Sequence, residues 1–139
     1  MSNFNNEDIE KKLDELIASQ FETEVTEFKE AKNSFSFDEL GQYFSALSNE
    51  ANLHNKNCAW LIFGIEDKKH IIVGTNYRKS AKDLNNLKEE IARQTSEHLS
   101  FIEIYECKRK DPAGKNQRIL LFQIPPAPKG IPIAFKRMY

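Results

Sequence analysis

Carboxylate side chains gather in two short segments of this sequence, each beside a strand-like run. Glu22, Glu24 and Glu27 lie within the strand-like residues 21–30, and Glu66 and Asp67 follow an apolar run over 58–65. Carboxylate oxygens are ligands that Mg²⁺ and Mn²⁺ prefer, and a bound metal ion can activate water for phosphodiester cleavage. If the two strands are neighbours, the acids meet at one sheet end as a metal and nucleic-acid site or as a solvated acidic edge.

The spacing of the first acids leaves both interpretations open. Glu22 and Glu27 are five residues apart, so on a regular strand their side chains point to opposite faces. A shared metal site therefore requires an irregular stretch near Glu22. Exposed glutamates before Lys29 also form ordinary cross-strand ion pairs.

The other chemically distinctive region is the basic C-terminal part. Residues 1–27 contain eight acidic and two basic side chains, whereas residues 108–139 contain eight basic and one acidic. Cations on adjacent strands would bind phosphates with little sequence preference and strong salt dependence. On a hairpin tip they would instead protect an edge strand from aggregation. The candidate cations are Lys108, Arg109, Lys110, Lys115, Arg118, Lys129, Lys136 and Arg137.

Other familiar chemistries have little support. The three histidines lack paired spacing for zinc, and Cys58 and Cys107 match no zinc pattern, so we expect reduced thiols. No phosphate-cradling Gly-x-x-x-x-Gly-Lys loop is present. Tyr77, followed by Arg78 and Lys79, could stack a nucleic-acid base or simply anchor its loop.

Helical and strand patterns define the elements that must position these residues. We expect a short amphipathic helix over 6–18 and a strand over 25–29. Ser36 and Glu39 form a capping box that begins a second helix, with Phe35 and Leu40 as its hydrophobic staple. The apolar run over 58–65 predicts a central strand.

The second half predicts one further helix and several strands. Residues 71–73 are expected as a hairpin partner of the central strand, and a helix begins at Ser80. Strands are expected over 101–107, 118–124 and 132–138. The whole predicts an α+β fold, a mixed β-sheet with two main covering helices plus a short N-terminal helix.

Length and composition favour one cytoplasmic domain. The 139 residues suffice for one modest core, and the longest apolar run, Cys58 to Phe63, is far too short for a membrane span. We expect residues 1–20 to form an N-terminal helical extension and residues 21–139 to form the domain.

The order of motifs resembles the AlbA_2 domain, also called the Schlafen AlbA_2 or divergent AAA-4 domain, from about Phe21 onward. The motifs are Glu22-x₄-Glu27-Phe28-Lys29, Ser45-Ala46-Leu47-Ser48-Asn49, Leu61-Ile62-Phe63-Gly64-Ile65-Glu66-Asp67, Ile72-Val73-Gly74 and Phe122-Gln123-Ile124-Pro125-Pro126-Ala127-Pro128. The family usually has a glycine-containing turn before the central strand, and residues 52–57 lack it. Because the family pattern continues past Tyr139, we expect a chain cut from a longer protein.

The resemblance implies a DNA-binding module of bacterial transcriptional regulators, with any ATP binding in a region beyond this chain. The alternative that it implies is a Schlafen-like ribonuclease that uses an acidic triad and Mg²⁺ or Mn²⁺. That triad would fall on Glu22, Glu27 and either Glu66 or Asp67, with Glu22, Glu27 and Asp67 as the metal ligands. DNA or RNA is the implied partner in both cases. A third hypothesis is an assembly module, in which exposed edge strands pair between chains as a homo-oligomer.

Overall fold

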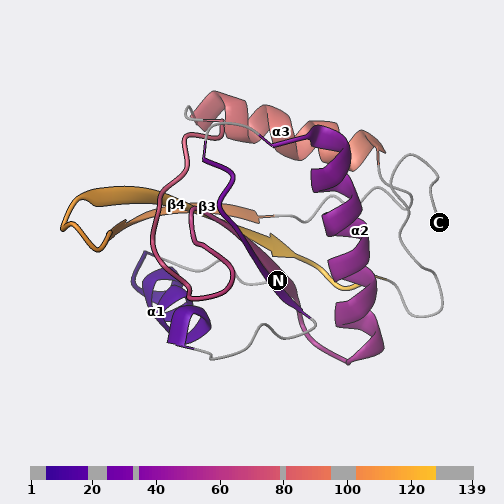
Figure 1. Cartoon of the computed structure of the whole chain (residues 1–139). Helices are drawn as coiled ribbons and strands as arrows, with labels where there is room; N and C mark the ends of the chain where they lie inside the picture. Colours follow the sequence, from indigo (N-terminus) through magenta and orange to yellow (C-terminus); the bar gives the residue numbers. More distant parts are fainter. Residues whose placement is uncertain (1–5, 19–24, 33–34, 79–80, 95–102, 128–139) are drawn as a thin grey trace.

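The computed structural model describes residues 6–18, 25–32, 35–78, 81–94 and 103–127. Within these residues three helices accompany one four-stranded sheet (Figure 1). The elements are α1 (Asn6–Ala18), β1 (Thr26–Lys29), α2 (Phe37–Leu53), β2 (Ala59–Phe63), α3 (Ala81–Gln94), β3 (Glu103–Lys110) and β4 (Asn116–Ile124). The expected α+β fold with a mixed sheet is therefore confirmed.

The sheet has the strand order β1-β2-β4-β3. β1 runs parallel to β2, and the remaining pairs are antiparallel. Helix α2 therefore connects the parallel strands β1 and β2 as a β-α-β crossover. Parallel pairing brings the carboxyl ends of β1 and β2 to one edge, where the Gly64 N–H donates to the Lys29 carbonyl at 2.8 Å.

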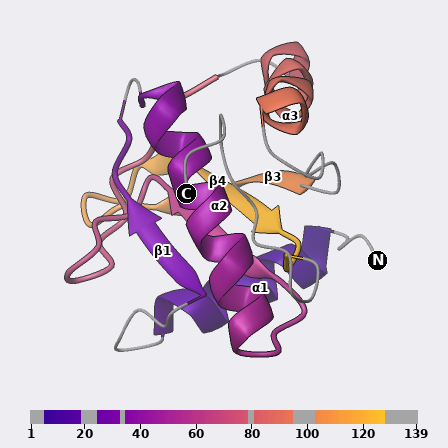
Figure 2. The ribbon, with the colours of Figure 1, turned by 90° about the vertical axis from the view of Figure 1, so that its right-hand side faces the viewer.

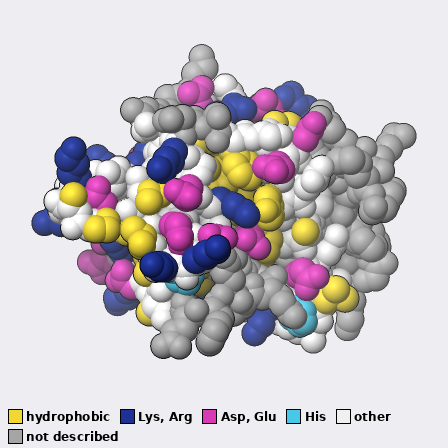
Figure 3. Space-filling model, in the orientation of Figure 1, with side chains coloured by type: hydrophobic (Ala, Val, Ile, Leu, Met, Phe, Trp, Pro, Cys, Tyr) yellow, Lys and Arg dark blue, Asp and Glu magenta, His cyan; other side chains and the backbone are white. Residues whose placement is uncertain are grey.

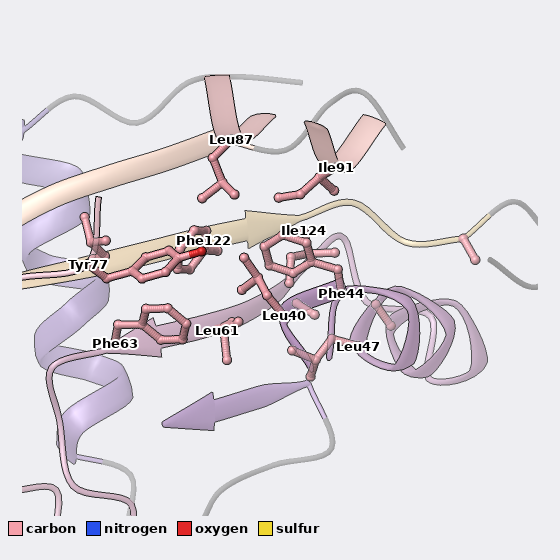
Figure 4. Close-up of a cluster of buried hydrophobic side chains, with 14 residues drawn as sticks. Leu40, Phe44, Leu47, Leu61, Phe63, Tyr77, Leu87, Ile91, Phe122 and Ile124 are labelled. Atoms are coloured by element: carbon pink, nitrogen blue, oxygen red, sulfur yellow. The ribbon is translucent and has the colours of Figure 1, made fainter. Parts of the chain in front are cut away.

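Helices cover both faces of the sheet. On one face α2 and α3 enclose a cluster that includes Phe44, Phe63, Leu87 and Phe122 (Figure 4). On the other face α1 packs Ile9 and Leu13 into a second cluster, whose other members include Phe28, Trp60, Ile62 and Leu121. The β2 strand is buried along its whole length, as its apolar run on both faces predicts. In Figure 1 the strand β1 lies between α1 and α2, and Figure 2 shows the same elements turned by 90°.

Helix α2 begins where the capping signal places it. Ser36 has extended backbone angles, and its Oγ accepts the Glu39 N–H at 3.3 Å. Residues 71–73, in contrast, do not form the expected hairpin strand, and an isolated bridge between Ile65 and Ile72 takes its place. The expected strand over 132–138 lies outside the described residues.

The β3–β4 hairpin extends beyond the rest of the sheet. β4 pairs with β2 only from Leu120 to Ile124, whereas its pairing with β3 continues to Lys110 and Asn116. The result is a two-stranded ribbon that projects from the sheet (Figure 1). Asp111 closes its turn by accepting hydrogen bonds from the N–H groups of Ala113 and Lys115, each at 2.9 Å.

Candidate functional site

Glu27 and Lys29 form the centre of the acidic edge. They are two residues apart on β1, so their side chains share one face. The Lys29 Nζ lies 3.8 Å from a Glu27 carboxylate oxygen and 4.9 Å from the centre of the Tyr43 ring on α2. A cation and a carboxylate are thus held side by side where two parallel strands end.

The electrostatics of Lys29 show which later acid belongs to this edge. A hydrogen bond with the Tyr43 side chain raises the pKa of Lys29 most, burial opposes it, and the charges of Glu27 and Asp67 add to the increase. Glu66 has a different task, because one of its carboxylate oxygens accepts the N–H groups of Lys68 and Lys69, each at 2.6 Å. Of the two acids after β2, Asp67 is therefore the one whose charge acts on Lys29.

The third member of the predicted triad, Glu22, lies outside the described residues. Within the part of the chain that the structure describes, no three His, Cys, Asp or Glu side chains gather closely enough to hold a metal ion. The metal set of Glu22, Glu27 and Asp67 stays a prediction. Of its three members, Glu27 and Asp67 are described, and the charges of both raise the pKa of Lys29.

On the hairpin, Arg109 is occupied by helix α1. Its Nη1 donates to a Glu10 carboxylate oxygen at 3.0 Å, and its Nη2 donates to Asp14 Oδ1 at 3.0 Å and to the Glu10 carbonyl at 3.0 Å. Arg109 thereby fastens α1 to the β3 edge of the sheet.

Arg118 is occupied by the segment over 75–78. Its guanidinium pairs with Glu106 and donates to the backbone carbonyls of Thr75, Tyr77 and Arg78. Its side chain is only 12% exposed. Arg118 therefore has a structural task, although it was a candidate for binding phosphate.

The cations that stay available are lysines. Lys108, Lys110 and Lys115 are exposed, and none forms a salt bridge within the described residues. Basic side chains accordingly gather at the projecting end of the hairpin, on the left of Figure 3, whereas acidic and basic groups alternate over the face in front of the sheet. Lys129, Lys136 and Arg137 lie outside the described residues.

Tyr77 anchors its loop and is not available to stack a base. Its side chain is buried, and its ring meets the Phe63 ring edge-on with 5.4 Å between centres. Burial also raises the pKa of its hydroxyl. Of the two alternatives that the sequence left open, the loop anchor is correct.

Of the two partners of the acidic edge, the sequence indicates only Lys29. Its spacing of two from Glu27 puts both side chains on one strand face, where an ion pair is expected. Tyr43 could not be found from the sequence, because its approach to Lys29 depends on how α2 docks beside β1.

Fold and site define an α+β domain with a mixed four-stranded sheet, an acidic edge and a lysine-bearing hairpin. The family model for Schlafen, AlbA_2 matches residues 22–138, so the chain belongs to this family. The family is generally associated with nucleic acids. A comparison with curated proteins gives no match. None of the helices within the described residues is long and apolar enough to cross a membrane.

Proposed function

We propose that this domain binds nucleic acid, and DNA in a regulatory context, through the hairpin lysines Lys108, Lys110 and Lys115. The observation that supports the proposal is their availability. They are exposed and form no salt bridge within the described residues, whereas the neighbouring Arg109 and Arg118 are both paired. The preference for DNA comes from the resemblance to bacterial transcriptional regulators.

The ribbon suits this task physically. It projects from the sheet, and the hydrogen bonds of Asp111 hold its turn in one conformation. The pKa of Asp111 is lowered, mainly because its carboxylate accepts a hydrogen bond from the Gln117 side chain. Because the backbone of the turn is fixed in advance, little backbone conformational entropy is lost there when the lysines meet phosphates. Lysine recognises phosphate as a point charge, so affinity should depend on salt more than on sequence.

The experiment is a salt series of binding by fluorescence anisotropy, with labelled single- and double-stranded DNA and RNA. For double-stranded DNA, the triple variant K108Q/K110Q/K115Q should reduce the slope of log affinity against log salt by about 2.7, because three phosphate contacts are lost. Tighter binding of DNA than of RNA would support the proposed preference for DNA.

A matched control is K56Q, in the loop before β2. Lys56 is exposed and precedes β2, whose other end, at Phe63, is the one nearer the hairpin. K56Q therefore removes a lysine at the opposite end of the sheet from the proposed binding site. K110Q alone should lower the slope by about 0.9, whereas K56Q should leave it unchanged. Equal effects of K110Q and K56Q would contradict a binding site on the hairpin.

The acidic edge favours a second candidate, a metal-dependent ribonuclease. Glu27 and Asp67 both act on Lys29, and parallel strands bring their segments to one edge. Carboxylates of Glu22, Glu27 and Asp67 would hold Mg²⁺ or Mn²⁺, and Lys29 would attract the phosphate beside them.

RNA cleavage with and without Mn²⁺ tests this candidate. E27Q and D67N should each abolish metal-dependent cleavage. E66Q should retain it, because the Glu66 carboxylate accepts hydrogen bonds from the backbone of the turn that follows it. Cleavage that survives in E27Q, or that is absent from the unmodified domain, would eliminate the candidate without affecting the binding proposal.

A further inference from the structure

The contact between Arg109 and α1 imitates the binding of a phosphate group. The guanidinium fork of arginine fits carboxylates and phosphates with the same parallel hydrogen bonds. Here two carboxylates, from Glu10 and Asp14, each accept from one terminal nitrogen of Arg109 at 3.0 Å. The α1 acids therefore occupy the donors that a nucleic-acid phosphate would use.

Helix α1 is a strongly acidic element outside the family match. It precedes residues 22–138, and its thirteen residues contain five carboxylates and two lysines. It is nevertheless held against the hairpin that carries the candidate lysines. A negative helix in this place reduces the positive potential of that hairpin.

The carboxylates can exchange without release of the helix. Ile9 and Leu13 are buried in the sheet cluster, and the Ile17 carbonyl contacts His70 Nδ1 at 3.0 Å. These contacts keep α1 in place. The side chains of Glu10 and Asp14 are 53% and 69% exposed, so both can turn into solvent and leave the N–H donors that they held to a phosphate. The bond from Nη2 to the Glu10 backbone carbonyl remains, because that carbonyl stays with the helix.

We propose that α1 is an autoinhibitory element in which Glu10 and Asp14 compete with nucleic-acid phosphates for Arg109. The inference rests on the binding function proposed above for the hairpin lysines. Arg109 lies between Lys108 and Lys110 on β3, which is an edge strand of the described sheet. Side chains from both faces of an edge strand can reach a nucleic acid that lies along it, so Arg109 and the two lysines can contact the same molecule.

The test compares E10Q/D14N with the unmodified domain in the same DNA salt series. Release of Arg109 adds one phosphate contact, so the slope should become steeper by about 0.9 and affinity at 0.15 M salt should rise about fivefold. The matched control is E7Q/E15Q, which removes the same charge from the same helix at residues that do not pair with Arg109 within the described residues. A gain in E10Q/D14N no larger than in E7Q/E15Q would overturn the inference.

A third variant shows whether the gain passes through Arg109. In E10Q/D14N/R109Q the gain should disappear, and a gain that persists there would also overturn the inference. If the unmodified domain binds and K108Q/K110Q/K115Q weakens it, but E10Q/D14N equals its control, autoinhibition alone fails. If no variant binds any nucleic acid, the proposed function fails as well. Thermal unfolding of each variant verifies that the fold is intact.

Discussion

Arg109 and Arg118 lie on opposite faces of one hairpin, and each fastens a different segment of the chain to it. Arg109 on β3 faces helix α1, whereas Arg118 on β4 faces the segment over 75–78. Adjacent strand positions alternate between faces, and the pairing of Arg109 with Gln117 places Arg118 on the other side. The hairpin is therefore a structural clamp through its two arginines and a candidate binding surface through its lysines.

Replacement of Arg118 should mainly affect stability. R118Q removes the donors of three backbone carbonyls from a side chain that is 12% exposed. We expect a loss of about 3 kcal/mol in the free energy of unfolding, because buried acceptors and a paired Glu106 lose their partner. Urea denaturation measures the loss. K108Q is the control on the cross-strand neighbour, with an expected change within about 0.5 kcal/mol. Equal stability of both variants would refute the structural task of Arg118.

Most of the fold was predictable from local sequence patterns. The cap at Ser36 and the apolar spacing of α2 are encoded in a few adjacent residues, and the β-α-β crossover follows from their order. The isolated bridge at Ile72 was not predictable in this way, because a short apolar run does not reveal how many backbone groups find partners.

The candidate site was less predictable because charge pairing depends on docking. The sequence gives Arg109 and Lys110 the same apparent role, yet one is bound by residues 95 and 99 positions away and the other is exposed. No local pattern separates them. The sequence left open whether Glu66 or Asp67 completes the acidic triad, and only the turn after β2 shows that Glu66 accepts hydrogen bonds from its own backbone neighbours.

Two serines of α2 should respond oppositely to removal of their hydroxyl groups. Ser48 Oγ donates to the Pro125 carbonyl at 2.7 Å, whereas the buried Ser45 Oγ has no partner within the described residues. S48A should cost about 1–2 kcal/mol of unfolding free energy, because a partly buried carbonyl loses its donor. S45A should be neutral or stabilising, because it removes a buried hydroxyl that gains no hydrogen bond. Chemical denaturation of both variants gives the comparison, and a larger loss in S45A than in S48A would contradict these contacts.

The buried thiol of Cys107 should make the fold sensitive to high pH. Burial raises its pKa to about 11. In the unfolded chain the thiol ionises near its ordinary pKa of about 8.5, so only the unfolded state gains the charge between these values. Its contribution to stability is therefore complete below about pH 8.5 and declines as pH rises toward 11. The free energy of unfolding should fall more steeply from pH 8.5 to 10.5 in the unmodified chain than in C107A. Parallel curves for the two proteins would show that the thiol does not contribute.

Gly64 should be the glycine whose replacement disturbs the acidic edge. Its φ is +102°, and an added Cβ would lie 2.9 Å from Ile119 Cδ1 and 3.0 Å from the Arg118 carbonyl. G64A should cost about 2–4 kcal/mol, from backbone strain and overpacking together. Because the Gly64 N–H binds the Lys29 carbonyl, the same variant should shift the NMR signals of Lys29 and Asp67.

Gly114 supplies the matched control, because it has the same kind of backbone without the crowding. Its φ is +86°, and an added Cβ would meet no atom within 4 Å. G114A should therefore cost only the backbone term, about 1–2 kcal/mol, and leave the signals of Lys29 and Asp67 in place. Denaturation and NMR spectra of the two variants separate strain from crowding. If G64A were no more destabilising than G114A, the close approach of β4 to Gly64 would not determine the geometry of the acidic edge.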